Sequence, residues 1–101
     1  MREVVKKRFG QNLRRVRRDR GLSQEALADL AGIHRTEVSL LERGGRDPEM
    51  GTMLKLAATL GVSLDELAAG ITWRPPAEGS SGGRFHISPG GDRETRGGPP
   101  R

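Results

Sequence analysis

The side chains best suited to chemistry in this sequence are hydrogen-bond donors gathered in residues 24–46. Arginine can donate two hydrogen bonds to the O6 and N7 atoms of guanine, while threonine and serine can reach a base edge or a phosphate oxygen. The candidate donors are Gln24, His34, Arg35, Thr36, Ser39, Arg43 and Arg46. These residue types suit contact with duplex DNA, provided that a rigid scaffold presents them together.

The spacing of apolar residues across this segment predicts two short helices joined at Gly32. The glycine permits a positive φ at little cost, so the chain can turn sharply between the helices. Ala28 is small enough to let the second helix approach the first. The apolar residues that would hold both helices on a shared core are Leu27, Ala31, Ile33, Val38 and Leu41. This pattern is typical of a helix-turn-helix whose second helix, about residues 34–43, lies in the major groove of DNA.

On a recognition helix over residues 34–43, the first turn and the outward face would meet base edges. Arg35 can pair with guanine, and Thr36 can present its methyl group to thymine and its hydroxyl to a base or phosphate. Ser39 is the next candidate, and Leu40 could make only apolar contacts. We therefore expect Arg35 and Thr36 to carry most of the base recognition.

Other donors flank this helix and suit phosphate contacts, which add affinity without sequence information. Gln24 begins the preceding helix, where free backbone N–H groups and the helix dipole attract anions. Arg43 and Arg46 follow the recognition helix. His34 is interpreted as a weak helix cap or a phosphate contact. A metal role is not expected, because His86 is its only histidine partner and lies in a segment predicted to be flexible.

Glu37 is the acidic side chain near the start of this helix. Its carboxylate could accept a hydrogen bond from cytosine N4, but neighbouring phosphates would repel it. Its position also suits capping of the helix start. We favour the capping role.

Further helices are predicted around this pair, which gives an all-α fold of five helices. The first covers about residues 4–20, because apolar residues recur there every three or four positions. The fifth covers about residues 64–69 and starts at a capping box formed by Ser63 and Glu66.

The fourth helix has two candidate starts. Asp47 could cap a helix that begins at Pro48, since proline is favoured at the first helical position. Alternatively, Glu49 precedes a helix that begins at Met50. Both readings end the helix before Gly61.

The charge of the chain is positive and uneven. The whole sequence carries a formal net charge of +5, and residues 1–20 alone hold nine basic and two acidic residues. Such asymmetry favours a polyanion partner near the N-terminus. The alternatives are a solvated basic helix or a helix lying on a membrane. The membrane reading is disfavoured, because the apolar stripe is narrow and the other helices need it as core.

Residues 71–101 contain seven glycines and five prolines, so we expect a flexible tail that cannot form a packed core. Two apolar islands interrupt it. Ile71 and Trp73 are expected to pack on the domain, and residues 84–88 could form one short strand. This tail motivates an alternative function, in which an antitoxin-like or coactivator-like module has another protein as its main partner.

Together these signals resemble the Cro/C1-type (XRE) helix-turn-helix family of bacterial and phage regulators. The resemblance covers about residues 8–70, and its motifs agree with one another in spacing. The matching residues are Leu13, Val16 and Arg17, then residues 21–24, Leu27, Ala28, Gly32, Ile33 and residues 42–44, and finally Pro48, Leu56, Ala57, residues 60–62 and Leu67. The stretch HRTEVSLLERG is also similar to the subset that includes restriction–modification controller proteins.

The resemblance implies a lambda-repressor-like DNA-binding domain over residues 4–70. It implies a transcription regulator, such as a repressor, that binds a palindromic operator as a homodimer. It also implies a structural ion pair between Arg17 on the first helix and Glu42 at the end of the recognition helix. The residues that we expect at the contact between two copies are Leu64, Ile71 and Trp73.

The composition bounds the remaining classes. The 101 residues include no cysteine, which excludes disulfide and thiol chemistry. Neither a membrane-length apolar run nor a signal-peptide core occurs, so we expect a cytoplasmic protein that joins the nucleoid when bound to DNA and has no membrane partner. No clustered acid–base pair, activated nucleophile or glycine-rich phosphate loop occurs, so no enzyme activity, cofactor or metal is expected.

Overall fold

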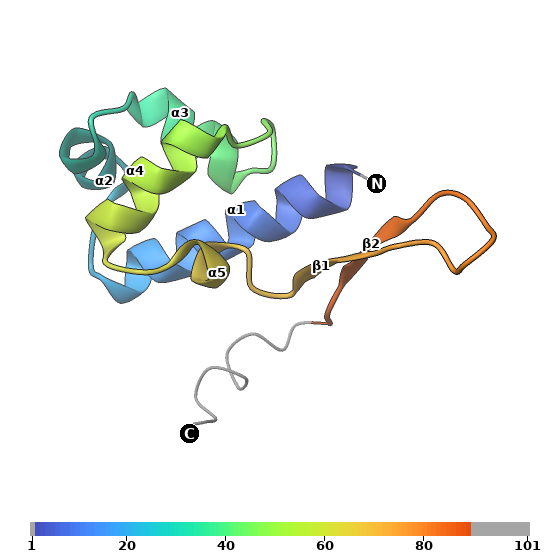
Figure 1. Cartoon of the computed structure of the whole chain (residues 1–101). Coiled ribbons are helices and arrows are strands. Elements are labelled where there is room, and N and C mark those ends of the chain that lie inside the picture. Colours follow the sequence, from blue (N-terminus) through green and yellow to red (C-terminus); the bar gives the residue numbers. More distant parts are fainter. Residues whose placement is uncertain (1, 90–101) are drawn as a thin grey trace, which may run out of the picture.

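The computed structural model describes residues 2–89, with the side chains of residues 3–89. Its elements are, in chain order, α1 (Arg2–Asp19), α2 (Gln24–Ala31), α3 (Arg35–Glu42), α4 (Met50–Leu60), α5 (Leu64–Leu67), β1 (Ile71–Arg74) and β2 (Arg84–Ile87). Figure 1 shows α1 as the long helix across the centre, with α2 and α3 above it, α5 below it and the two strands reaching past its N-terminal end. The predicted all-α class with five helices is confirmed.

A single apolar core holds these helices together. Phe9, Leu13 and Val16 of α1 recur at helical spacing, and each is at most 3% exposed. The other helices contribute the remaining buried core residues, which are Leu27, Ala28, Ala31, Val38, Leu41, Leu56, Ala57, Leu60 and Leu67. Burial of these side chains in one core fixes the angles between helices that are too short to be stable alone.

The turn between α2 and α3 follows from local sequence signals. Gly32 has a φ of 73° and a ψ of 34°, in the left-handed region that glycine enters without a steric penalty. The N–H of Ile33 then donates to the carbonyl oxygen of Ala28 at 3.0 Å. At the other end of α2, the Ser23 hydroxyl accepts a hydrogen bond from the N–H of Ala26 at 3.0 Å. Both ends of α2 are therefore defined by residues next to it in the chain.

The start of α4 decides between the two predicted starts, and the end of α5 differs from the predicted end. α4 begins at Met50 with Glu49 as its N-cap, so the alternative start at Pro48 is wrong. α5 ends at Leu67, two residues before the predicted end. It is short because the side chain of Asn12 binds the carbonyl oxygens of Leu67 and Ala69 at 2.8 and 2.9 Å and so replaces helical hydrogen bonds.

The start of the predicted tail is a β-hairpin. β1 and β2 pair antiparallel, with Ile71 opposite Ile87 and Trp73 opposite Phe85. The expectation of a flexible tail from residue 71 is therefore wrong for both strands, because cross-strand pairing and contact with α1 order them. Ile71 packs against the core as expected, whereas Trp73 is 53% exposed. Residues 90–101 of the expected tail lie outside the described residues.

Candidate nucleic-acid interface

A polar network at the centre of the fold fixes α3 to α1. Arg17 donates from Nε to Oε2 of Glu42 at 2.5 Å and from Nη2 to Oε1 at 3.0 Å. Its Nη1 donates to the carbonyl oxygen of Leu22 at 2.7 Å. The Glu42 side chain is only 3% exposed, so this pair lies almost entirely away from water. The hydrogen bond to Glu42 raises the pKa of Arg17 above its ordinary value, and burial partly opposes the rise.

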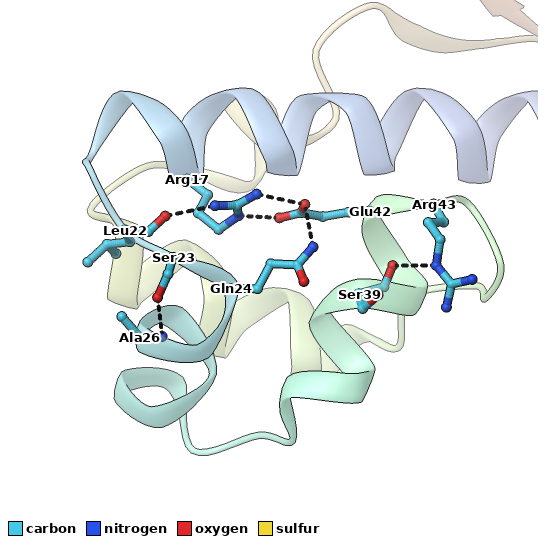
Figure 2. A network of polar contacts seen from close by, with 8 residues as sticks. All are labelled: Arg17, Leu22, Ser23, Gln24, Ala26, Ser39, Glu42 and Arg43. Atoms are coloured by element: carbon cyan, nitrogen blue, oxygen red, sulfur yellow. Dashed lines mark hydrogen bonds and ion pairs between the residues drawn. The ribbon is translucent and has the colours of Figure 1, made fainter.

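Gln24 belongs to the same network. Its Nε2 donates to Oε1 of Glu42 at 3.0 Å, so the side chains of α1, α2 and α3 converge on one carboxylate (Figure 2). The sequence predicts a phosphate contact for Gln24 and gives no sign of this bond. The Ser23 cap takes the N–H of Ala26, and the N–H of Leu27 makes the first helical bond, so neither bond uses the N–H groups of Gln24 and Glu25 at the start of α2.

The first turn of α3 presents unpaired donors to solvent. His34, Arg35 and Thr36 are all exposed, and within residues 3–89 none of their side chains makes a hydrogen bond or an ion pair. Ser39 and Leu40 lie one turn further along and are half-buried. The opposite face of the helix carries Val38 and Leu41 of the core. This orientation brings the predicted base-reading residues together on one surface.

The basic residues after α3 are held by local contacts. Arg43 donates from Nε to the carbonyl oxygen of Ser39 at 3.3 Å, so its side chain lies back along the helix (Figure 2). Arg46 donates from Nη1 to Oε1 of Glu37 at 2.6 Å. The capping role expected for Glu37 is wrong within residues 3–89, because His34 is the N-cap residue there and makes no side-chain cap hydrogen bond. Glu37 binds the arginine of the following loop instead.

Two residues that position α3 and α5 were not identified from the sequence. Gly10 of α1 is buried, and a Cβ atom there would lie 2.6 Å from the carbonyl oxygen of Glu42. Asn12 is fully buried and ties α1 to the end of α5. The available signal was their position beside Phe9 and Leu13, on the apolar face of a helix where a glycine and an amide are unusual.

Residues 2–89 contain neither a metal-ligand cluster nor a membrane-spanning helix. Between residues 2 and 89, no three or more His, Asp or Glu side chains gather as metal ligands would. No helix in the same part of the chain combines the length and apolarity that crossing a membrane requires.

Comparison with known proteins gives matches to the helical part of this chain. A family model described as helix-turn-helix matches residues 13–67. An uncharacterised HTH-type transcriptional regulator, y4dJ of Sinorhizobium fredii, is 43% identical over 63 residues, which is 62% of this chain and 82% of that protein. Two regulators of Bacillus subtilis also match, and the chain spans 57% and 53% of their lengths.

Solved structures agree with the sequence relatives. The restriction-modification controller protein C.AhdI of Aeromonas hydrophila has a TM-score of 0.60 and 45% identity, over 61% of this chain and 94% of that one. SinR, a master regulator of biofilm formation solved in complex with DNA, has a TM-score of 0.57 and 32% identity, over 58% of this chain and 95% of that one. The chain therefore belongs to the Cro/C1-type (XRE) helix-turn-helix family of transcriptional regulators, with a lambda-repressor-like DNA-binding domain.

Proposed function

We propose that the protein regulates transcription by binding a specific sequence in duplex DNA as a homodimer, with α3 in the major groove. The observation that carries this proposal is the exposed first turn of α3. Arg35 and Thr36 there have no partner among residues 3–89, while the other end of the same helix is fixed by the buried pair of Arg17 and Glu42. Free donors on a rigid helix can read base edges without first breaking internal bonds.

The contacts divide into base reading and positioning. Arg35 pairs with guanine O6 and N7, and Thr36 and Ser39 meet the neighbouring bases or phosphates. The residues assigned to the phosphate backbone are Gln24, His34, Arg43 and Arg46. SinR supports DNA as the partner of this domain, because that similar protein has been solved in complex with DNA.

Two copies are part of the proposal for a geometric reason. One helix of eight residues reaches only a few base pairs. Two copies related by a twofold axis read two half-sites about 34 Å apart, on a palindromic operator. Bound there, the protein would lie at the nucleoid.

The test is selection of bound sequences from a random DNA pool, followed by titration of the selected operator. The selected sequences are expected to contain an inverted repeat with centres about 10 base pairs apart. Arg35→Ala is expected to lose about 1–3 kcal/mol of discrimination at one base pair in each half-site. Arg18→Ala removes the same charge from an exposed position of α1 and serves as the control, with unchanged base preference. Equal affinity of the wild-type protein for operator and random DNA would contradict the proposal.

A further inference from the structure

The β-hairpin formed by β1 and β2 is held firmly on the domain at its base. The N–H of Ser88 donates to the carbonyl oxygen of Gly70 at 2.8 Å, which closes the base of the hairpin. Arg8 of α1 donates from Nη2 to the carbonyl oxygen of Ser88 at 2.6 Å. Figure 1 shows the loop between the two strands reaching past the N-terminal end of α1. The hairpin is therefore fixed relative to α1, while its loop end projects into solvent.

The two faces of the hairpin differ in chemistry. Directly opposed residues share a face, and faces alternate along each strand. The face that contains Ile71 is turned toward the domain, because Ile71 packs against the core. The residues on this face are Ile71, Trp73, Phe85 and Ile87. The residues on the opposite face, which points away from the core, are Thr72, Arg74, Arg84 and His86.

The outward face carries two arginines in direct opposition. Arg74 and Arg84 pair across the strands, and both residues are exposed. Among residues 3–89, neither guanidinium makes a hydrogen bond or an ion pair. Glu78 in the intervening loop is also exposed and makes no ion pair in the same range. Because like charges directly opposite each other destabilise a strand pair, an anion bound between the two arginines would offset their repulsion.

An open cavity of about 350 Å³ lies between these arginines and the loop. Its lining residues are Arg74, Pro75, Pro76, Ala77, Ser80, Gly82, Gly83 and Arg84. The two arginines are the charged members of this lining, so the cavity attracts anions. Its size lies near the lower end of the range for small-molecule pockets, which begins at about 300 Å³. The cavity therefore suits a small anionic ligand.

Local contacts hold the wall of this cavity in shape. The rings of the two prolines at the start of the loop fix their φ angles. The hydroxyl and the N–H of Ser80 both donate to the carbonyl oxygen of Ala77, at 2.7 and 3.0 Å. Gly83 lies directly against Trp73, since a Cβ atom at Gly83 would be 2.5 Å from Cζ2 of the indole. A ligand would meet a loop that is already folded, which lowers the entropic cost of binding.

We propose that Arg74 and Arg84 bind the phosphate group of a small organic phosphate in this cavity. Each guanidinium presents a planar fork of N–H donors that matches the oxygens of a phosphate. A phosphate monoester carries a charge of about −1.5 to −2 at neutral pH, so one group offsets both arginines. The prolines of the lining provide an apolar wall for the organic part of the ligand.

This site goes beyond the proposed function and does not depend on it. The cavity shares no lining residue with the surface assigned to DNA, and its face of the hairpin points away from the helical core. A free small molecule reaches such a cavity more readily than the backbone of a duplex that lies against α3.

Titration of the full chain with inorganic phosphate and with ribose 5-phosphate tests the proposal. The ionic strength is held constant with sodium chloride, so that general screening does not change. Calorimetry measures binding directly, and the single tryptophan, Trp73, reports on the neighbouring loop by its fluorescence. Saturable binding of one phosphate group per chain is expected. Failure of both compounds to bind saturably would overturn the proposal.

Substitutions separate this site from general attraction to a basic protein. Arg74→Gln and Arg84→Gln are each expected to weaken phosphate binding about tenfold or more, as for a lost charged hydrogen-bond donor. Arg74→Lys keeps the charge without the fork and is expected to fall between these variants and the wild type. Arg18→Gln removes the same charge from an exposed position of α1 and is the matched control, with unchanged binding. Circular dichroism checks that all variants fold. Wild-type phosphate affinity in the double variant of Arg74→Gln and Arg84→Gln would overturn the proposal.

Titration with duplex DNA of random sequence distinguishes the DNA backbone from a small ligand. The double variant is expected to keep the salt dependence of the wild type. A salt dependence reduced by about two phosphate contacts, with neither small compound bound, would assign both arginines to DNA and overturn the proposal. Because the small compounds are titrated without DNA, failure of the proposed function would leave their binding unaffected.

Discussion

Glu42 is the residue on which the orientation of α3, the proposed recognition helix, depends. Its carboxylate accepts two hydrogen bonds from Arg17 and one from Gln24, so three helices meet at one buried charge. Removal of one partner leaves the other charge in a site that water barely reaches, and such losses are more costly than the net strength of the pair.

Arg17→Ala is therefore expected to destabilise the protein by about 3–5 kcal/mol, because it leaves the Glu42 carboxylate buried with a single weak partner. The measurement is the free energy of unfolding in urea. Arg18→Ala is the control on the next, exposed residue and should change stability by less than about 0.5 kcal/mol. A loss below about 1 kcal/mol for Arg17→Ala would show that the network is dispensable.

In the proposed complex with DNA, Arg46 reaches a phosphate only by leaving Glu37, since its guanidinium is bound to that carboxylate at 2.6 Å. Glu37→Gln weakens this internal competitor and removes a negative charge beside the DNA. Binding is expected to tighten on operator and random sequences alike, by about threefold to tenfold for an exposed pair of this kind.

Arg46→Ala provides the opposite case, with weaker binding on all sequences and a salt dependence that falls by about one phosphate contact. Fluorescence anisotropy at several salt concentrations measures both variants. In the Arg46→Ala background, Glu37→Gln should lose most of its gain. Persistence of the full gain would mean that Glu37 acts by repelling DNA directly.

At the scale of elements, α1 is the support to which α3, with its proposed DNA-reading surface, and the hairpin are attached. α3 approaches it closely at Gly10, and Asn12 and Arg8 tie α5 and the hairpin to it. Figure 1 shows α3 and the hairpin on different sides of this helix. Both surfaces are therefore joined through one rigid element while remaining spatially distinct.

Gly10→Ala is expected to destabilise the protein by about 1–3 kcal/mol, because the new methyl group would overlap the backbone at the end of α3. Gly51→Ala is the matched control in α4, where a Cβ atom has nothing within 4 Å. There the better helix propensity of alanine is expected to add about 0.5–1 kcal/mol. Thermal unfolding of both variants gives the comparison, and equal shifts of the same sign would reject the close-approach role of Gly10.

At the scale of the whole molecule, the proposed dimer joins two sites of base reading. Arg35→Ala should leave the monomer–dimer equilibrium unchanged, and the wild-type protein should bind a single half-site more weakly than the full operator. The reason is that linking two half-site contacts in one dimer raises the effective concentration of the second. In the proposed complex, the basic residues within positions 1–20 would add attraction to DNA that is independent of its sequence.

Most helix boundaries could be read from the sequence because they depend on neighbours in the chain. Gly32 and the Ser23 cap define α2 through bonds that span only three to five residues, and the apolar spacing of Leu27, Val38 and Leu41 places one face of each helix inward. The pair of Arg17 and Glu42 was expected from the family resemblance, and the structure contains it.

Tertiary structure alone decided which distant side chains became partners. Arg46 binds Glu37, and Gln24 binds Glu42. From the sequence, Arg46 and Gln24 had been assigned to phosphate contacts and Glu37 to capping. A short strand over residues 84–88 was expected, but its pairing with residues 71–74 was missed, because that pairing spans a loop rich in glycine and proline whose composition indicates flexibility. Local propensity fixes where a helix begins and ends, whereas partner choice depends on where helices cross, and that is set by burial of the whole core.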